Sequence, residues 1–175
     1  MEIKRPFNLQ NWINNNRHLL KPPVGNKNLY VESGDYIVMI VAGPNARKDY
    51  HYNETEELFY QIEVDIVVKT QQDGKLVEYD IKEGEMFLLP SKIPHSPIRP
   101  EGSIGLVIEK KRQVNEKDGL MWFSETANAL LYEEYFHLTN VEKDFLPVFK
   151  RFYSNEKLRT CPKTGEIMEV DERYL

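Results

Sequence analysis

The 175-residue chain contains one cysteine, Cys161, so no disulfide bond can form within it. It has no apolar run near the roughly 20 residues that a membrane-spanning helix needs. Its N-terminus also lacks the apolar core and cleavage site of a signal peptide. Acidic residues outnumber basic ones, 28 to 23, and the resulting net charge of -5 argues against non-specific binding to nucleic acid. We therefore expect a cytoplasmic protein without a membrane or nucleic-acid partner.

Hydrophobic residues make up 41% of the chain, which is enough for a packed core in a single domain. Between residues 36 and 110, about seven short β-branched and apolar segments alternate with turns, of which Asp73-Gly74 is a strong hairpin signal. The longest of these predicted strands covers residues 58–70. The pattern predicts an all-β sandwich or barrel.

Segments outside this core follow other patterns. Residues 7–20 predict a short helix, with Asn8 as its N-terminal cap. Towards the C-terminus, residues 120–123 and 129–136 predict two further strands, and apolar residues at helical spacing follow them. We expect a small helical extension there, and then an extended tail over residues 155–175.

Two segments, residues 43–57 and 84–99, contain the side chains that point to chemistry. These side chains are Arg47, His51, Glu57, His95 and Arg99. Two histidines and one carboxylate are the ligand set that leaves open positions on a non-haem Fe(II) ion. Each histidine also has an arginine four residues away. The sequence therefore predicts a metal site beside two cationic groups.

The alternative is that both histidines are ordinary core or surface residues and that Glu57 is a solvated acid. The matched spacing of histidine and arginine argues against it, because two arginines in one cavity cost desolvation free energy. They imply an anionic partner, most simply a carboxylate held by paired hydrogen bonds. Glu56 and, more weakly, Glu54 stay open as rivals, because a shift of one residue turns a strand side chain to the opposite face.

These two segments resemble the two cupin motifs, with one histidine in the first where many cupins have two. More narrowly, the chain resembles the 3-hydroxyanthranilate 3,4-dioxygenase family over nearly its whole length. The matching segments are residues 19–23, 38–47, 49–51, 57–61, 87–90, 93–97 with Arg99, 105–109, 119–122, 131–134 and 151–153.

The resemblance implies a mostly β cupin, a jelly-roll barrel or double-stranded β-helix, forming one domain over residues 1–175. Its barrel core would cover about residues 30–110 and its C-terminal extension about residues 111–175. The resemblance also implies one Fe(II) ion per chain and a homodimer. The iron ligands would be His51, Glu57 and His95.

Substrate contacts follow from the same resemblance. Arg47 and Arg99 match residues that bind the substrate, and Glu109 matches an acid beside its hydroxyl and amino groups. The implied reaction opens the ring of 3-hydroxyanthranilate with O2 and gives 2-amino-3-carboxymuconate semialdehyde, the precursor of quinolinate. Glu109 would act as a general base. This chemistry belongs to tryptophan breakdown or NAD synthesis. Two alternatives are another ring-cleaving cupin dioxygenase and a non-enzymatic ligand-binding cupin.

The chain departs from the family pattern in two ways. Val64 and Lys92 stand where cupins often have glycine, so we expect altered loops with unchanged chemistry. Bacterial and fungal members also often carry two Cys-x-x-Cys pairs that hold a second, structural metal. The matching positions here are Ser124, Ala127, Cys161 and Thr164. One cysteine cannot build a four-thiolate site, so the sequence predicts that the second metal is absent.

Overall fold

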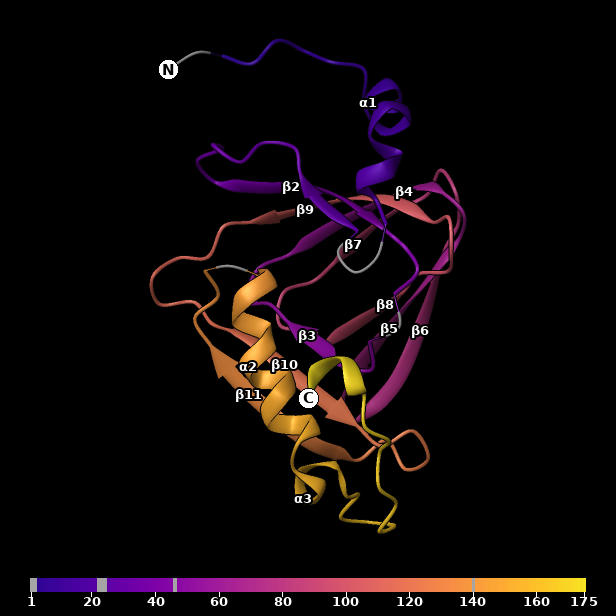
Figure 1. Ribbon diagram of the computed structural model, residues 1–175, viewed down its shortest axis with the longest axis vertical. Helices are drawn as coiled ribbons and strands as arrows, with labels where there is room; N and C mark the ends of the chain where they lie inside the picture. The colour runs from indigo at the N-terminus through magenta and orange to yellow at the C-terminus, as the bar shows by residue number, and fades with distance from the viewer. Residues whose placement is uncertain (1–2, 22–24, 46, 140) are drawn as a thin grey trace.

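Eleven strands form in the part of the chain that the computed structural model describes, residues 3–21, 25–45, 47–139 and 141–175. The strands, in chain order, are β1 (Asn26–Asn28), β2 (Tyr36–Ala42), β3 (Tyr50–Tyr52), β4 (Glu57–Glu63), β5 (Ile66–Gln72), β6 (Lys75–Ile81), β7 (Met86–Leu89), β8 (His95–Ile98), β9 (Ile104–Lys110), β10 (Asp118–Phe123) and β11 (Leu130–Phe136). They make two antiparallel sheets, of order β1-β2-β9-β4-β7 and β11-β10-β3-β8-β5-β6. The sheets face each other around a common interior (Figure 1).

The interior of the barrel is largely apolar, because alternate residues of each strand point inward. Its central cluster takes side chains from both sheets, namely Phe59, Ile66, Val68, Ile81, Leu89 and Val107. Asp73 and Gly74 form the predicted hairpin turn, with φ angles of 49° and 74°, between β5 and β6. The prediction of a mostly β jelly-roll barrel is confirmed.

The predicted N-terminal helix is present as α1 (Leu9–Asn16), continued by a 3-10 turn, η1 (Arg17–Leu19). Asn8 caps α1, since its side chain accepts a hydrogen bond from the Asn11 backbone N–H at 2.8 Å. Ile13 is fully buried against apolar residues of β2 and β9. The helix therefore covers part of the outer face of the five-stranded sheet (Figure 1).

The single strand predicted over residues 58–70 is wrong. This segment forms two strands, β4 in the five-stranded sheet and β5 in the six-stranded sheet. The chain turns between them at Val64, whose φ of 60° lies in the left-handed region and ends the extended backbone. β-branched and apolar residues lie on both sides of this turn. Residue type alone therefore did not indicate that one strand ends and another begins here.

Val64 and Lys92 take a backbone conformation that normally favours glycine, with φ angles of 60° and 66°. Both turns therefore keep a glycine-like geometry although a side chain is present. For a β-branched residue such as Val64, left-handed backbone is strained by roughly 1–2 kcal/mol. Valine at position 64, where cupins often have glycine, is therefore accommodated with local backbone strain.

The C-terminal region packs against β10 and β11 as three short elements (Figure 1). These elements are α2 (Val141–Tyr153), α3 (Glu156–Arg159) and a 3-10 turn, η2 (Glu172–Tyr174). Trp122 of β10 is completely buried and stacks on Phe152 of α2, with ring centroids 4.2 Å apart. None of the described helices is long and apolar enough to cross a membrane.

The expectation of an extended tail over residues 155–175 is wrong. Besides α3 and η2, the segment contains a β-bridge between Thr160 and Ile167. Buried Arg159 donates hydrogen bonds to the backbone carbonyl groups of Tyr153 and Met168. One buried guanidinium thus fixes a stretch that has little periodicity in its sequence.

The four positions that match the family's second metal site lie in two facing turns. The Ser124 hydroxyl accepts hydrogen bonds from the backbone N–H groups of Ala127 and Ala129, at 3.3 and 3.2 Å. Hydrogen bonds with Thr164 and Ser124 lower the pKa of the Cys161 thiol to about 7. Hydrogen bonds among these side chains and the backbone therefore link the two turns, and the absence of a second metal stays a prediction.

Replacing Val64 with glycine should stabilise the protein. We expect Val64→Gly to raise the free energy of unfolding by about 1 kcal/mol, because glycine relieves the left-handed strain while adding some entropy to the unfolded chain. Urea unfolding measures the change. The control is Val114→Gly at a 96% exposed valine with no positive φ, where no gain is expected. An equal gain in both variants would contradict strain at Val64.

Candidate metal centre

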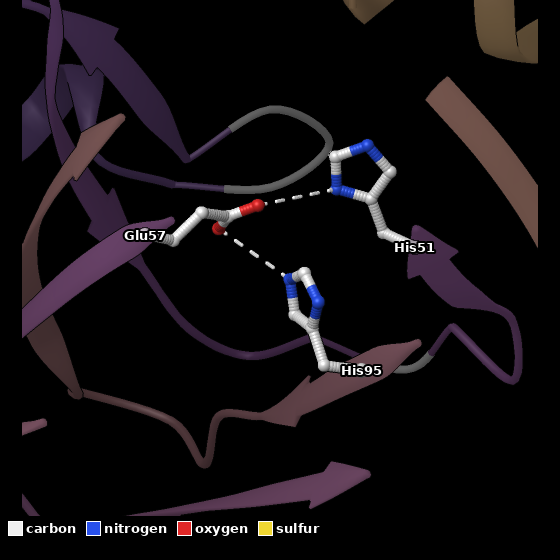
Figure 2. A group of neighbouring side chains, drawn as sticks. All are labelled: His51, Glu57 and His95. Atoms are coloured by element: carbon white, nitrogen blue, oxygen red, sulfur yellow. Dashed lines mark ion pairs between the residues drawn. The ribbon is translucent and has the colours of Figure 1, made fainter. Parts of the chain in front are cut away.

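The structure brings His51, Glu57 and His95 together from three strands, β3, β4 and β8 (Figure 2). His51 and His95 are partners in the ladder between β3 and β8. His51 Nδ1 lies 3.8 Å from Glu57 Oε1, and His95 Nε2 lies 3.4 Å from Glu57 Oε2. One donor atom from each residue lies within 4.8 Å of the others, which is a spacing that a single metal ion can bridge.

Hydrogen bonds leave one ring nitrogen of each histidine facing Glu57. His95 Nδ1 donates to the Ile93 carbonyl at 3.1 Å, so Nε2 is the available nitrogen. His51 Nε2 lies 2.6 Å from Asp118 Oδ2, so Nδ1 is the available nitrogen. Burial alone would raise the pKa of Glu57, but the adjacent His95 and His51 lower it to about 2. The donor set thus fits a divalent cation.

The two rivals of Glu57 point elsewhere. Glu56 is exposed, as expected for a residue one position out of phase with Glu57. The Glu54 carboxylate accepts a hydrogen bond from the Lys117 backbone N–H at 2.8 Å. Only Glu57 of the three lies between the histidines.

Asp118, the first residue of β10, and Arg112, in the loop before it, also belong to the site, although the sequence analysis did not single them out. Asp118 is completely buried and accepts hydrogen bonds from His51 and from two nitrogens of Arg112. Arg112 Nη1 also lies 2.9 Å from Glu109 Oε2. Arg112 thus joins the carboxylate that orients His51 to the predicted general base. No spacing rule signals such a link, because the loop that holds Arg112 has no regular pattern.

Glu109 lies next to Glu57, its partner in the ladder between β9 and β4. Asn53 bridges the two acids, since its amide donates to Glu57 Oε1 and to Glu109 Oε2 at 3.1 Å each. Burial, reinforced by the charge of Glu57, raises the pKa of Glu109 to about 7. Near neutral pH, Glu109 can therefore both accept and release a proton.

Arg99 is buried inside the barrel, and no carboxylate of the described residues pairs with its guanidinium. It is 3% exposed, and its Nη1 donates to the Gln61 side-chain oxygen at 3.3 Å. Burial lowers the pKa of Arg99 to about 10, so the guanidinium still carries its charge at neutral pH. A buried cation bonded only to a neutral amide favours an incoming anion.

Arg47 differs from Arg99 because it already has an acidic partner. Its Nε and Nη2 donate to the two carboxylate oxygens of Asp49, which is 2% exposed. Its guanidinium also lies 5.2 Å from the ring centroids of Phe145 and Phe149, both on α2. The two predicted substrate arginines are therefore not equivalent in this structure.

Inward-facing residues of β4, β9 and the β8 segment form three successive layers, spaced about 7 Å apart by the strand rise. The first layer contains Glu57, Glu109 and His95; the second contains Phe59, Val107 and Pro97; the third contains Gln61, Gly105 and Arg99. Acidic and metal-binding groups thus lie at one end and a cation at the other, with an apolar layer between them.

A family model and full-length sequence relatives agree on one family. The family model of 3-hydroxyanthranilic acid dioxygenase matches residues 1–153. A protein of Xanthomonas euvesicatoria pv. vesicatoria (strain 85-10), named 3-hydroxyanthranilate 3,4-dioxygenase, is 53% identical over 169 residues, covering 97% of this chain and 95% of its own. A protein of the same name from Ruegeria pomeroyi is 46% identical over 162 residues, covering 92% and 89%. A solved cupin-2 domain protein from Shewanella frigidimarina aligns with 57% of this chain and 92% of its own, at 18% identity and a TM-score of 0.45.

Removing the charge of Asp118 should weaken metal binding. We expect Asp118→Asn to lower the affinity for Fe(II) by roughly 10–100-fold, because His51 loses the carboxylate that fixes its orientation. Anaerobic competition with a chromophoric chelator measures the affinity without any turnover. The control is Asp80→Asn on an exposed face of β6, which should bind Fe(II) like the parent protein. Unchanged affinity in Asp118→Asn would show that this contact does not orient the ligand.

The raised pKa of Glu109 should make the stability of the metal-free protein depend on pH. Between about pH 4.5 and 7 the folded state holds a proton on Glu109 that the unfolded state has released, so stability falls as pH rises. The Glu109 contribution to this fall is on the order of 3 kcal/mol. Urea unfolding across this window should show a shallower fall for Glu109→Gln, whereas identical slopes would contradict the shift.

Proposed function

Because this chain belongs to the 3-hydroxyanthranilic acid dioxygenase family, we propose that its metal centre opens the aromatic ring of 3-hydroxyanthranilate with O2. The product is 2-amino-3-carboxymuconate semialdehyde, the precursor of quinolinate. The observation that carries the proposal is the group of His51 with the buried Glu57 and His95, in the same interior as Arg99, a buried cation bonded to a neutral amide. The first group suits a metal that reacts with O2, and the second suits the carboxylate of the substrate.

Iron is the metal that we propose, with one Fe(II) per chain held by His51, Glu57 and His95. Two neutral imidazoles and one carboxylate are a donor set that would hold Fe(II) and would leave positions for further ligands. When bound, Fe(II) supplies the redox chemistry through which O2 reacts with the ring. The protein supplies geometry, charge and the exclusion of water.

Arg99 and Arg47 bind the substrate carboxylate in this proposal. Arg99 offers a desolvated cation whose present partner, Gln61, is neutral. Arg47 uses Nε and Nη2 for Asp49, which leaves Nη1 for the substrate. Phe145 and Phe149 on α2 keep the Arg47 guanidinium from rotating freely. We therefore assign the stronger charge contribution to Arg99 and an orienting contribution to Arg47.

Glu109 is the proposed general base. Its Oε atoms accept the proton of the substrate hydroxyl, which makes the ring more electron-rich before it meets O2. The raised pKa of Glu109 makes it a stronger base than an exposed glutamate. Asn53 donates to Glu109 Oε2 and Arg112 pairs with the same oxygen, so both hold the carboxylate in place.

We further propose that the protein is cytoplasmic and that it forms a homodimer. The outer face of the five-stranded sheet supports the dimer, because its half away from α1 is apolar. Residues on this half include Leu58, Tyr60, Met86, Leu88 and Ile108, of which Met86 and Leu88 are 64% and 54% exposed. Exposed apolar faces of this kind often mark protein interfaces. A second copy is the proposed occupant, and analytical ultracentrifugation measures the oligomeric state.

A joint measurement of metal content and activity tests the proposed function. The protein is purified without oxygen, iron per chain is counted, and the absorbance of the semialdehyde is followed after adding 3-hydroxyanthranilate and O2. We expect about one iron per chain and product formation. His95→Ala should lose iron and activity together, while Glu56→Ala, at an exposed neighbouring acid, should keep both. Bound iron without product formation would indicate a different ring-cleaving reaction. Tight binding of 3-hydroxyanthranilate without any turnover would favour a ligand-binding protein.

A further inference from the structure

We propose that Gln61 is a positioning residue, which sets the direction of the Arg99 guanidinium and keeps its charge available to a carboxylate ligand. The inference rests on the proposed function in one respect, namely that Arg99 binds the carboxylate of the substrate. Gln61 itself touches neither substrate nor metal in this proposal. It acts through Arg99, to which its side-chain oxygen is bonded at 3.3 Å.

The orientation of the Gln61 amide is fixed by the backbone. Gln61 is 1% exposed, and its Nε2 donates to the carbonyl oxygens of Glu63 and Val64 at 2.8 and 2.5 Å. Both amide hydrogens are therefore used, and the oxygen must face the opposite way, towards Arg99. A glutamine held in this manner cannot rotate to offer its amino group to the guanidinium.

The turn at Val64 supplies these two carbonyl groups. The ladder between β4 and β9 shifts register between Gln61 and Glu63, and the left-handed residue follows directly. The Val64 backbone N–H donates to the Glu83 carboxylate at 3.1 Å, which ties the turn to the connection between β6 and β7. Two successive carbonyls consequently point at one side chain, an arrangement that a regular strand does not allow because its carbonyls alternate.

Gly105 makes the contact between Gln61 and Arg99 possible. It is the ladder partner of Gln61, on the neighbouring strand β9. A Cβ atom at this position would lie 2.8 Å from the Gln61 side-chain oxygen and 3.0 Å from Arg99 Nη1. Any other residue would push the two groups apart, so glycine is required here for space.

A neutral partner matters because it leaves the charge of Arg99 uncompensated. A carboxylate at position 61 would form a buried ion pair with Arg99 and would compete with the substrate for the same guanidinium. The amide oxygen accepts one N–H, and the remaining donors of the guanidinium stay directed away from Gln61. Gln61 therefore favours carboxylate ligands over otherwise similar ligands that lack the acid group.

Ligand pairs that differ by one carboxylate test the inference. Anaerobic calorimetry on the iron-loaded protein compares 3-hydroxyanthranilate and anthranilate with 2-aminophenol, which lacks the acid group. For Gln61→Glu we expect the affinity for both carboxylate ligands to fall by roughly 10–100-fold, with 2-aminophenol and iron content unchanged. In turnover, KM for 3-hydroxyanthranilate should rise more than kcat falls. The control is Gln72→Glu, whose amide bonds Thr70 and Tyr79 and not Arg99.

Gly105→Ala provides a second test that leaves Gln61 in place. It should displace Arg99 and weaken the carboxylate ligands selectively, as in Gln61→Glu. An equal loss for all three ligands in either variant, or unchanged affinity for anthranilate, would overturn the inference. If the parent protein binds anthranilate but does not turn over 3-hydroxyanthranilate, the proposed function fails, and the selectivity of the two variants still decides the role of Gln61.

Discussion

The cost of burying charge governs the interior of this barrel. Three carboxylates, Glu57, Glu109 and Asp118, are each 5% exposed or less, and they lie around a single guanidinium, Arg112. Negative charge therefore exceeds positive charge at this end of the interior. A divalent cation between His51 and His95 would offset the excess, and so does a proton on Glu109, whose pKa is raised to about 7. The protein is thus built to hold a metal, a proton or both.

Arg99 is separated from this acidic cluster by the layer of Phe59, Val107 and Pro97. Separation matters, because an arginine within reach of Glu57 or Glu109 would be neutralised and could not attract a carboxylate. The charge of Arg112 is neutralised in this way, because Arg112 pairs with both Glu109 and Asp118. Arg112 and Arg99 therefore have different roles, because they lie at different distances from the acidic cluster along the strands. One stabilises the acids around the metal site, and the other stays available for a ligand.

The sequence predicted the barrel and the capped helix at Asn8, because both depend on local patterns. The grouping of His51, Glu57 and His95, which lie on three strands, was predicted from their chemistry as a ligand set and from the family resemblance. Spacing alone left Glu56 open, and the strand phase resolves it in the structure. Asp118, Arg112 and Asn53 escaped prediction because their roles arise only when distant segments meet. Gln61 could have been found, since a glutamine in phase with Glu57 must point into the barrel.

The strand wrongly drawn over residues 58–70 and the missed role of Gln61 have one physical origin, the turn at Val64. Its left-handed backbone moves the chain from one sheet to the other, and it presents the two carbonyls that fix the Gln61 amide. Strained backbone persists where the surrounding structure determines it, and it concentrates near functional sites. Here the bond between the turn and Glu83, together with the sheets on both sides, holds the strain. The strained backbone at Val64 thus sets the direction of the Arg99 guanidinium in the interior. It does so through the Gln61 amide, for which Gly105 leaves the space.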